Sequence, residues 1–113
     1  MTEKEVQEIY NRLLELTKAG AIEWKKSGEE QFTTSFSRSS VSLSRDDEAV
    51  MTIYNEDGLE IAYVAPSQVG ENEAIKEFIL DPSELFNLVR EKVYKYSETS
   101  ENILDELRKL KAS

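Results

Sequence analysis

The spacing of apolar residues changes twice along the chain, and this pattern constrains the fold more than any other feature. Residues 2–19 carry apolar side chains at the three- and four-residue intervals of an amphipathic helix. After Gly20 the interval becomes two, which is typical of strands with one buried face. From residue 82 onward the helical spacing returns and continues almost to the end. The sequence therefore predicts a helix, a group of strands and further helix.

The first helix has recognisable ends. Thr2 and Glu5 have the spacing of a capping box, in which each side chain bonds the backbone N–H of the other residue. Gly20 stands where a residue in the left-handed conformation commonly ends a helix. We therefore predict a helix over residues 2–19. Its apolar stripe comprises Val6, Ile9, Tyr10, Leu13, Leu14 and Leu16.

Five short runs of alternating apolar and polar residues follow Gly20. They cover residues 22–26, 32–36, 40–44, 50–54 and 59–64. Turn-forming sequences separate the runs, at residues 25–29, 38–39, 45–48 and 55–58. Asn55-Glu56-Asp57-Gly58 is the clearest, because Asp-Gly supplies the positive φ of a tight hairpin. Short links between neighbouring strands predict an antiparallel meander.

The last third of the chain is less regular. Residues 66–72 are typical of a loop, and residues 75–80 fit either a sixth strand or a short helix, of which we favour the strand. Asp81 as N-cap and Pro82 at the first helical position predict the start of a helix. The polar residues 97–102 indicate a break, so residues 82–111 form either one helix or two. A second helix would be capped by Thr99 or Ser100 and span residues 101–111.

An antiparallel sheet with one apolar face needs a cover on that face, and the first and last helices can supply it. We therefore predict one α+β domain over residues 1–113. It consists of an N-terminal helix, an antiparallel β-meander of four to six strands, and a C-terminal helix or helix pair packed on one sheet face.

The residue types that the chain lacks exclude several chemistries. It has no histidine and no cysteine, which removes Ser-His-Asp and Cys-His catalysis, zinc sites built from these ligands, histidine-ligated haem and iron–sulfur clusters. Carboxylate-dependent hydrolysis with Mg²⁺ is the enzymatic alternative that remains, but no carboxylate pair in a pocket can be read from the sequence. We therefore expect no enzyme and assign no catalytic residue, metal or cofactor. With no apolar span and no leader visible, we expect a cytoplasmic protein that does not bind membranes.

The negative charge of the chain is concentrated in its middle. Residues 46–84 carry eleven acidic residues and one base, Lys76, a sum of −10, whereas the whole chain has a net charge of −9. Such a field repels nucleic acid and anionic membranes and favours a basic partner. We therefore predict a non-enzymatic protein-interaction module, of adaptor, immunity or inhibitor type, that docks a basic protein surface. The candidate partner-binding residues are Asp46, Asp47, Glu48, Glu71, Glu73 and Glu77.

Each of these features also has a plainer interpretation. The acidic run at 46–48 is explained by a solvated turn, and it matches no defined metal-binding loop. The acidic ladder from Glu71 to Glu84 is explained by a charged sheet edge that resists aggregation. The Ser/Thr-rich run at 33–44 is either the wet face of two strands or a hydrogen-bonding platform.

That platform motivates the alternative hypothesis, an oligomeric small-molecule binder or sponge that uses the Ser/Thr-rich sheet face. Such a protein would self-associate through its C-terminal helix. The apolar positions that are surplus to a core would mediate the contact, and they include Phe86, Tyr94 and Leu104.

Three motifs resemble a recurrent type of small bacterial and phage α+β protein. They are the sheet entry Gly20-Ala21-Ile22-Glu23-Trp24, the hairpin Tyr54-Asn55-Glu56-Asp57-Gly58 and the closing helix segment Ile103-Leu104-Asp105-Glu106-Leu107. The resemblance covers most of the chain and implies the α+β fold and a bacterial or phage origin. It supplies no catalytic residues. The chain departs from this type by its longer acidic segment, from Pro66 to Asp81.

Overall fold

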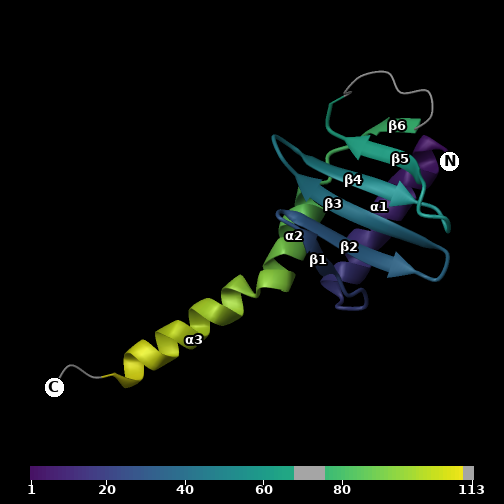
Figure 1. Cartoon of the computed structure of the whole chain (residues 1–113). Helices are drawn as coiled ribbons and strands as arrows, with labels where there is room; N and C mark the ends of the chain where they lie inside the picture. The colour runs from purple at the N-terminus through teal and green to yellow at the C-terminus, as the bar shows by residue number, and fades with distance from the viewer. Residues whose placement is uncertain (68–75, 111–113) are drawn as a thin grey trace.

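The computed structural model describes residues 1–67 and 76–110, which form a six-stranded sheet and three helices (Figure 1). The predicted α+β architecture is confirmed. The elements are α1 (Glu3–Lys18), β1 (Lys25–Gly28), β2 (Gln31–Phe36), β3 (Ser39–Arg45), β4 (Ala49–Tyr54), β5 (Glu60–Ala65), β6 (Lys76–Ile79), α2 (Ser83–Tyr94) and α3 (Tyr96–Lys109).

The strands lie in the sheet in the same order as in the sequence, β1 to β6. Each pair from β1 to β5 is antiparallel, as the short predicted turns require. The strand favoured for residues 75–80 is confirmed over Lys76–Ile79, but it pairs with β5 in parallel. A parallel neighbour needs a long connection that returns the chain to the same end of the sheet, and residues 66–75 separate these two strands. The meander therefore ends at β5.

One face of the sheet carries a continuous apolar row. In-register pairing joins one buried side chain from each strand between β2 and β6. The row consists of Phe32, Leu43, Met51, Val64 and Phe78. Successive side chains of a strand alternate between the two faces of the sheet. The residues that flank this row along each strand therefore point to the other face.

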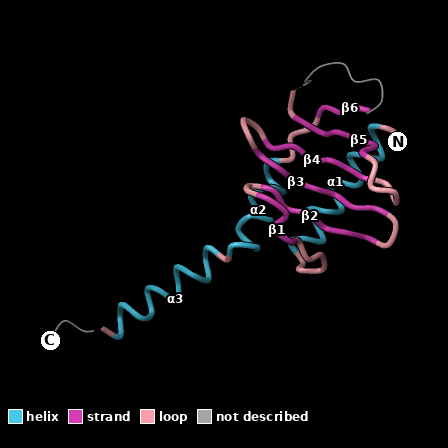
Figure 2. Tube along the Cα trace, in the orientation of Figure 1, coloured by secondary structure: helices cyan, strands magenta, loops and turns pink. Residues whose placement is uncertain are grey.

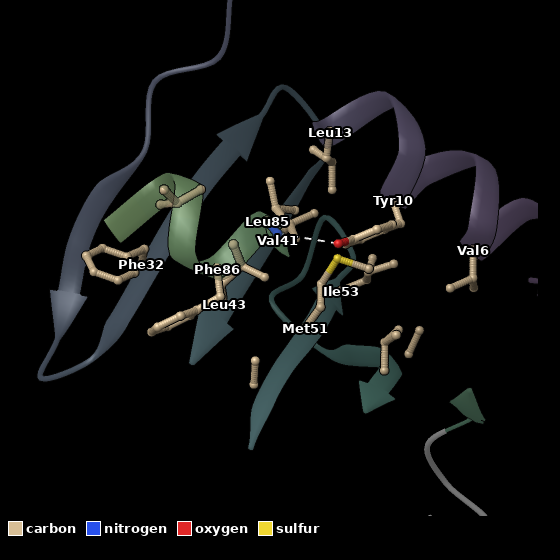
Figure 3. Close-up of a cluster of buried hydrophobic side chains, with 14 of the residues drawn as sticks. Val6, Tyr10, Leu13, Phe32, Val41, Leu43, Met51, Ile53, Leu85 and Phe86 are labelled. Atoms are coloured by element: carbon tan, nitrogen blue, oxygen red, sulfur yellow. Dashed lines mark hydrogen bonds between the residues drawn. The ribbon is translucent and has the colours of Figure 1, made fainter. Parts of the chain in front are cut away.

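Helices α1 and α2 cover the apolar row (Figure 1). Val6, Tyr10 and Leu13 of α1 point toward the strands, and Leu85 and Phe86 of α2 meet them from the neighbouring position (Figure 3). The ring of Phe86 lies 5.7 Å from that of Phe32, centroid to centroid. The helix cover that the sequence predicts is thus supplied by α1 and α2.

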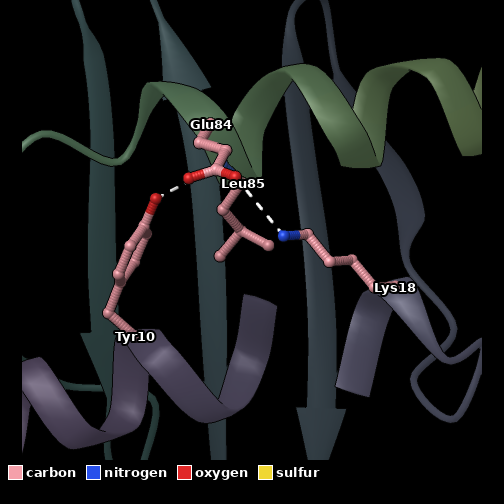
Figure 4. A network of polar contacts seen from close by, with 4 residues as sticks. All are labelled: Tyr10, Lys18, Glu84 and Leu85. Atoms are coloured by element: carbon pink, nitrogen blue, oxygen red, sulfur yellow. Dashed lines mark hydrogen bonds and ion pairs between the residues drawn. The ribbon is translucent and has the colours of Figure 1, made fainter. Parts of the chain in front are cut away.

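Two polar contacts join α1 to α2 across this layer (Figure 4). The backbone N–H of Leu85 donates to the hydroxyl of Tyr10 over 3.4 Å, and Lys18 forms a 3.4 Å ion pair with Glu84. Burial raises the pKa of the Tyr10 phenol, aided by the nearby carboxylates of Glu84 and Asp81. The ion pair is largely exposed, so the packing of α1 on α2 depends mainly on apolar burial.

The ends of α1 follow the sequence closely. Thr2 and Glu5 form the predicted capping box, with both side-chain-to-backbone bonds present. Gly20 has φ +74°, and the N–H of Ala21 donates to the carbonyl of Leu16, which is the bonding pattern of a Schellman cap.

Three predicted boundaries are wrong in detail. Residues 22–24 are not a strand, and β1 instead occupies Lys25–Gly28, where a turn was expected. Helix α2 begins at Ser83, one residue later than expected, although Asp81 still accepts from the Ser83 N–H. The helix pair divides at Lys95, which is left-handed with φ 55°, so α3 starts at Tyr96, five residues before the predicted second helix.

Helix α3 extends away from the sheet and its two covering helices (Figures 1 and 2). Its first turn is held to the domain by aromatic contacts, in which Tyr96 stacks on Tyr94 with centroids 5.5 Å apart and the Arg90 guanidinium lies over Tyr96. Every residue from 98 to 110 is exposed. The molecule is therefore elongated, with extents of 67 × 30 × 23 Å.

Trp24 enters the core just before β1 and makes a buried hydrogen bond. Its indole N–H donates to the hydroxyl of Thr17 over 3.0 Å, and Thr17 is fully buried. Replacing Thr17 with Val would leave the indole N–H without this partner. We expect Thr17→Val to lower the free energy of unfolding by about 1–3 kcal/mol.

Urea denaturation followed by the fluorescence of Trp24, the single tryptophan, measures this loss. Thr17→Ser is the matched control, because it keeps the hydroxyl and removes only the methyl group. Equal stability of Thr17→Val and the unmodified protein would show that the bond contributes nothing.

Candidate functional site

The second face of the sheet is polar and is not covered by any element within residues 1–67 and 76–110 (Figure 1). We call it the open face. In-register pairing places a row of side chains, one from each strand, across this face from β2 to β6. These residues are Thr33, Ser42, Thr52, Tyr63 and Glu77, of which Ser42 and Thr52 in the middle of the row are buried. The row is thus uncharged from β2 to β5 and negatively charged at β6, where Glu77 lies.

Three carboxylates act on Tyr63 at the acidic end of the open face. Partial burial raises the pKa of the Tyr63 phenol first, and the negative charges of Glu48, Glu77 and Glu60 raise it further. Glu77 is the in-register neighbour of Tyr63 on β6. Glu48 comes from the turn between β3 and β4, and its carboxylate accepts a 2.8 Å hydrogen bond from Ser67. These four residues, Glu48, Glu60, Tyr63 and Glu77, are called the acidic patch below.

The predicted partner-binding residues divide into three groups. Glu48 and Glu77 belong to the acidic patch and are partly buried. Asp46 and Asp47 are exposed in the adjacent β3–β4 turn. Glu71 and Glu73 lie outside the described residues. Glu60 was not among the predicted residues, because only the pairing of β5 with its neighbours reveals its proximity to Tyr63.

The bases nearest to the acidic patch in sequence lie on the helix-covered face. Lys76 of β6 donates to the carbonyl of Met1 over 2.8 Å, and its ammonium lies over the Phe78 ring. Arg45, next to Asp46, stacks on Phe86 and pairs with Glu30 at 3.6 Å. Neither base lies on the open face, so neither neutralises the charges of Glu48, Glu60 and Glu77 that act on Tyr63.

The predicted Ser/Thr-rich platform is only partly realised. Alternation places Thr33, Ser35 and Ser42 on the open face, but Thr34 faces inward and donates to the carbonyl of Glu23 over 2.9 Å. A shallow hollow of about 400 Å³ lies beside Thr33 and Ser35, where residues 21–25 run past β2.

An apolar groove opens between α1 and the ends of the β2–β3 and β4–β5 hairpins. It has a volume of about 620 Å³. Ile9, Leu16, Phe36 and Ile61 are among its lining side chains, and Arg12 and Glu8 stand at its rim. Sequence reasoning missed this groove because its walls come from segments far apart in the chain. Three apolar residues of the predicted helix and strands, Leu16, Phe36 and Ile61, line the groove and are left exposed by the core.

Helix α3 presents a stripe of exposed apolar side chains. Tyr96, Ile103, Leu104, Leu107 and Leu110 are each about half or more exposed. Of the residues proposed for self-association from sequence, Phe86 is fully buried and Tyr94 packs edge-on against Phe32, whereas Leu104 belongs to this stripe. Two of the three residues proposed for self-association therefore pack on the core from α2, and only Leu104 is exposed on α3.

Within residues 1–67 and 76–110, no three acidic side chains are grouped closely enough to hold a metal ion. The helices in that part of the chain are too short and too polar to cross a membrane.

Comparison of the chain with models of protein families, with curated proteins and with solved structures finds no match. The function has to be argued from the faces and charges of this fold.

The acidic patch has a spectroscopic consequence. Because negative charge beside a phenol disfavours the phenolate, we expect Glu48→Gln and Glu77→Gln each to lower the pKa of Tyr63 toward its ordinary value. Titration of ¹³C-labelled tyrosine by NMR measures the change. Tyr10 is an internal control, since neither Glu48 nor Glu77 contributes to its raised pKa. An unchanged Tyr63 titration in both variants would place these carboxylates away from the phenol.

Proposed function

We propose that this protein is a non-enzymatic interaction module that docks a basic protein surface on the open face of its sheet. One observation carries the proposal: on the face that no described element covers, Glu77 is the in-register neighbour of Tyr63, and the negative charges of Glu48 and Glu60 also act on its phenol, while the nearby bases Lys76 and Arg45 lie on the opposite face.

The geometry of the patch suits protein recognition. The phenol of Tyr63 is protonated at neutral pH, as in any tyrosine, and its raised pKa keeps it so at higher pH, so it can donate a hydrogen bond to an acceptor. Ile79 lies on the same side of β6 as Glu77 and is 70% exposed. Docking surfaces usually combine an apolar centre with a polar rim. Here Tyr63 and Ile79 would supply the centre, and the carboxylates of the acidic patch the rim.

Electrostatic complementarity would act mainly on the rate and specificity of docking. A concentrated negative field attracts a basic surface over a distance of about a Debye length, roughly 8 Å at physiological salt. The same field disfavours nucleic acid, whose phosphates carry the same sign as the patch. The expected partner is therefore a protein with a basic surface, for example a toxin or an enzyme.

Charge reversal tests this proposal. We expect the double variant Glu48→Lys/Glu77→Lys to reduce capture of a basic partner from cell lysate by roughly tenfold or more. The matched control is Glu15→Lys/Glu29→Lys, which changes the net charge equally at exposed sites on α1 and in the β1–β2 turn. Quantitative mass spectrometry of the retained proteins, at low and high salt, gives the measurement.

Two results would contradict the proposal. In the first, the same protein is retained equally by the Glu48/Glu77 variant and by the unmodified chain. In the second, the control variant loses as much binding as the patch variant, which would show that net charge rather than the patch governs retention. Thermal melting of all variants confirms that each remains folded.

The apolar groove supports a second candidate function, the binding of an apolar small molecule. Its volume of about 620 Å³ falls within the range of ligand pockets, about 300–1,000 Å³. This alternative differs from the predicted Ser/Thr platform, because the groove lies on the helix-covered side of the sheet and its lining is mostly aliphatic and aromatic.

A fluorescent fatty acid titrated into the protein tests this alternative. We expect Ile61→Glu, which places a charge in the groove lining, to abolish a binding signal that Leu59→Glu leaves intact. Leu59 is a matched control because it is exposed on the same hairpin but does not line the groove. Absence of binding by the unmodified protein, or equal binding by both variants, would rule the groove out as the site.

A further inference from the structure

Helix α3 poses a physical problem that the acidic patch does not solve. A 14-residue helix without tertiary contacts is marginal in water, since isolated helices shorter than about 12–15 residues are rarely stable. Beyond its first turn, α3 makes no packing contact in the described structure, and its residues 98–110 are all exposed. The side chains of Ile103, Leu104, Leu107 and Leu110 therefore remain in water.

The residues along this exposed side have the spacing of a coiled-coil seam. Their positions advance alternately by four and by three residues, which keeps them on one side of a helix. The seam consists of Tyr96, Ser100, Ile103, Leu107 and Leu110, and Leu104 lies beside it.

We propose that α3 is a self-association element that pairs with α3 of a second copy of this chain in an antiparallel coiled coil. The proposal is independent of the acidic patch, because it uses a different element and a different partner.

The side-chain sizes along the seam favour the antiparallel direction. With the two-fold axis near Asp105, Leu107 of one copy faces Ile103 of the other, and Leu110 faces the small Ser100. In a parallel pair, Ser100 would face Ser100 and leave a void in the seam, because coiled-coil layers then join identical positions. The most exposed apolar residue of the helix, Leu110 at 74%, is thus matched with the one small residue of the seam.

The charges along α3 point the same way. The first half of the helix carries Glu98 and Glu101 and no base, whereas its last turn carries Arg108 and Lys109. Antiparallel pairing lays the acidic first half of one helix along the basic last turn of the other, twice across the two-fold axis, with Glu101 and Arg108 on the same outer side of the seam. Arg108 already contacts Asp105 of its own helix at 3.2 Å, but such an exposed pair contributes little and leaves the guanidinium free to turn.

The antiparallel direction also separates the two domains. Each chain has a net charge of −9, so like charges repel when both domains lie at one end of a short helical seam. Antiparallel pairing places the two domains at opposite ends of the seam. The opposed helix dipoles add a small favourable contribution.

Sedimentation velocity over a range of protein concentrations tests the association. We expect the unmodified chain to pass from monomer to dimer, and Leu107→Asp to weaken the dimer by about a hundredfold or more, since two leucines leave the seam. Each single reversal, Glu101→Lys or Arg108→Glu, weakens it by about fivefold or more, and the double reversal in one chain restores it. Glu15→Lys is the control for net charge.

Cross-linking fixes the direction of the helices, because the chain contains no cysteine of its own. With a short bis-maleimide we expect Leu104→Cys to cross-link to its own copy, since Leu104 lies next to the two-fold axis. Ser100→Cys should not, because its copies are separated by about ten residues of helix rise, roughly 15 Å.

The proposal is overturned if the unmodified chain stays monomeric at every concentration, or if Leu107→Asp leaves the dimer intact. Failure of the double reversal to restore the dimer, or cross-linking of Ser100→Cys in place of Leu104→Cys, would contradict the antiparallel register. Because α3 lies outside the core, circular dichroism of these variants should report an unchanged sheet domain.

Discussion

Burial of one sheet face under two helices is the interaction on which the rest of this structure depends. The in-register row of Phe32, Leu43, Met51, Val64 and Phe78 must be removed from water, and α1 and α2 remove it. A one-residue slip of any strand would exchange its faces, so this row also fixes what the open face displays. The position of Glu77 beside Tyr63 on the open face is therefore a consequence of core packing.

Sequence reasoning captured what local spacing determines. The capping box of Thr2, the hairpin at Asn55–Gly58 and the helix–strand–helix order are all decided by nearby residues, and all are present. It failed where distant partners decide. Lys25–Gly28 has no alternating pattern and becomes β1 only by pairing with β2. The break at Lys95 carries no glycine or proline signal, and stacking of Tyr94 on Tyr96 accompanies it.

The site could be predicted to a similar extent. The location of the charge was visible in the sequence, and two of the six predicted residues, Glu48 and Glu77, raise the pKa of the Tyr63 phenol. Glu60 and the apolar groove were missed because both arise from strand pairing and helix placement. The acidic patch and the α3 stripe lie on separate elements, so the two proposed surfaces do not overlap.

Whether the open face is a docking surface is decided most directly by mapping contact on the protein itself. The measurement is a titration of ¹⁵N-labelled protein with a lysine-rich peptide, followed by backbone amide shifts in NMR spectra. Shifts concentrated at Tyr63, Glu77 and the β3–β4 turn, and absent in the Glu48→Lys/Glu77→Lys variant, are the result expected from this geometry. Shifts spread evenly over all acidic residues, or centred on α1 or α3, would contradict a docking role for the open face.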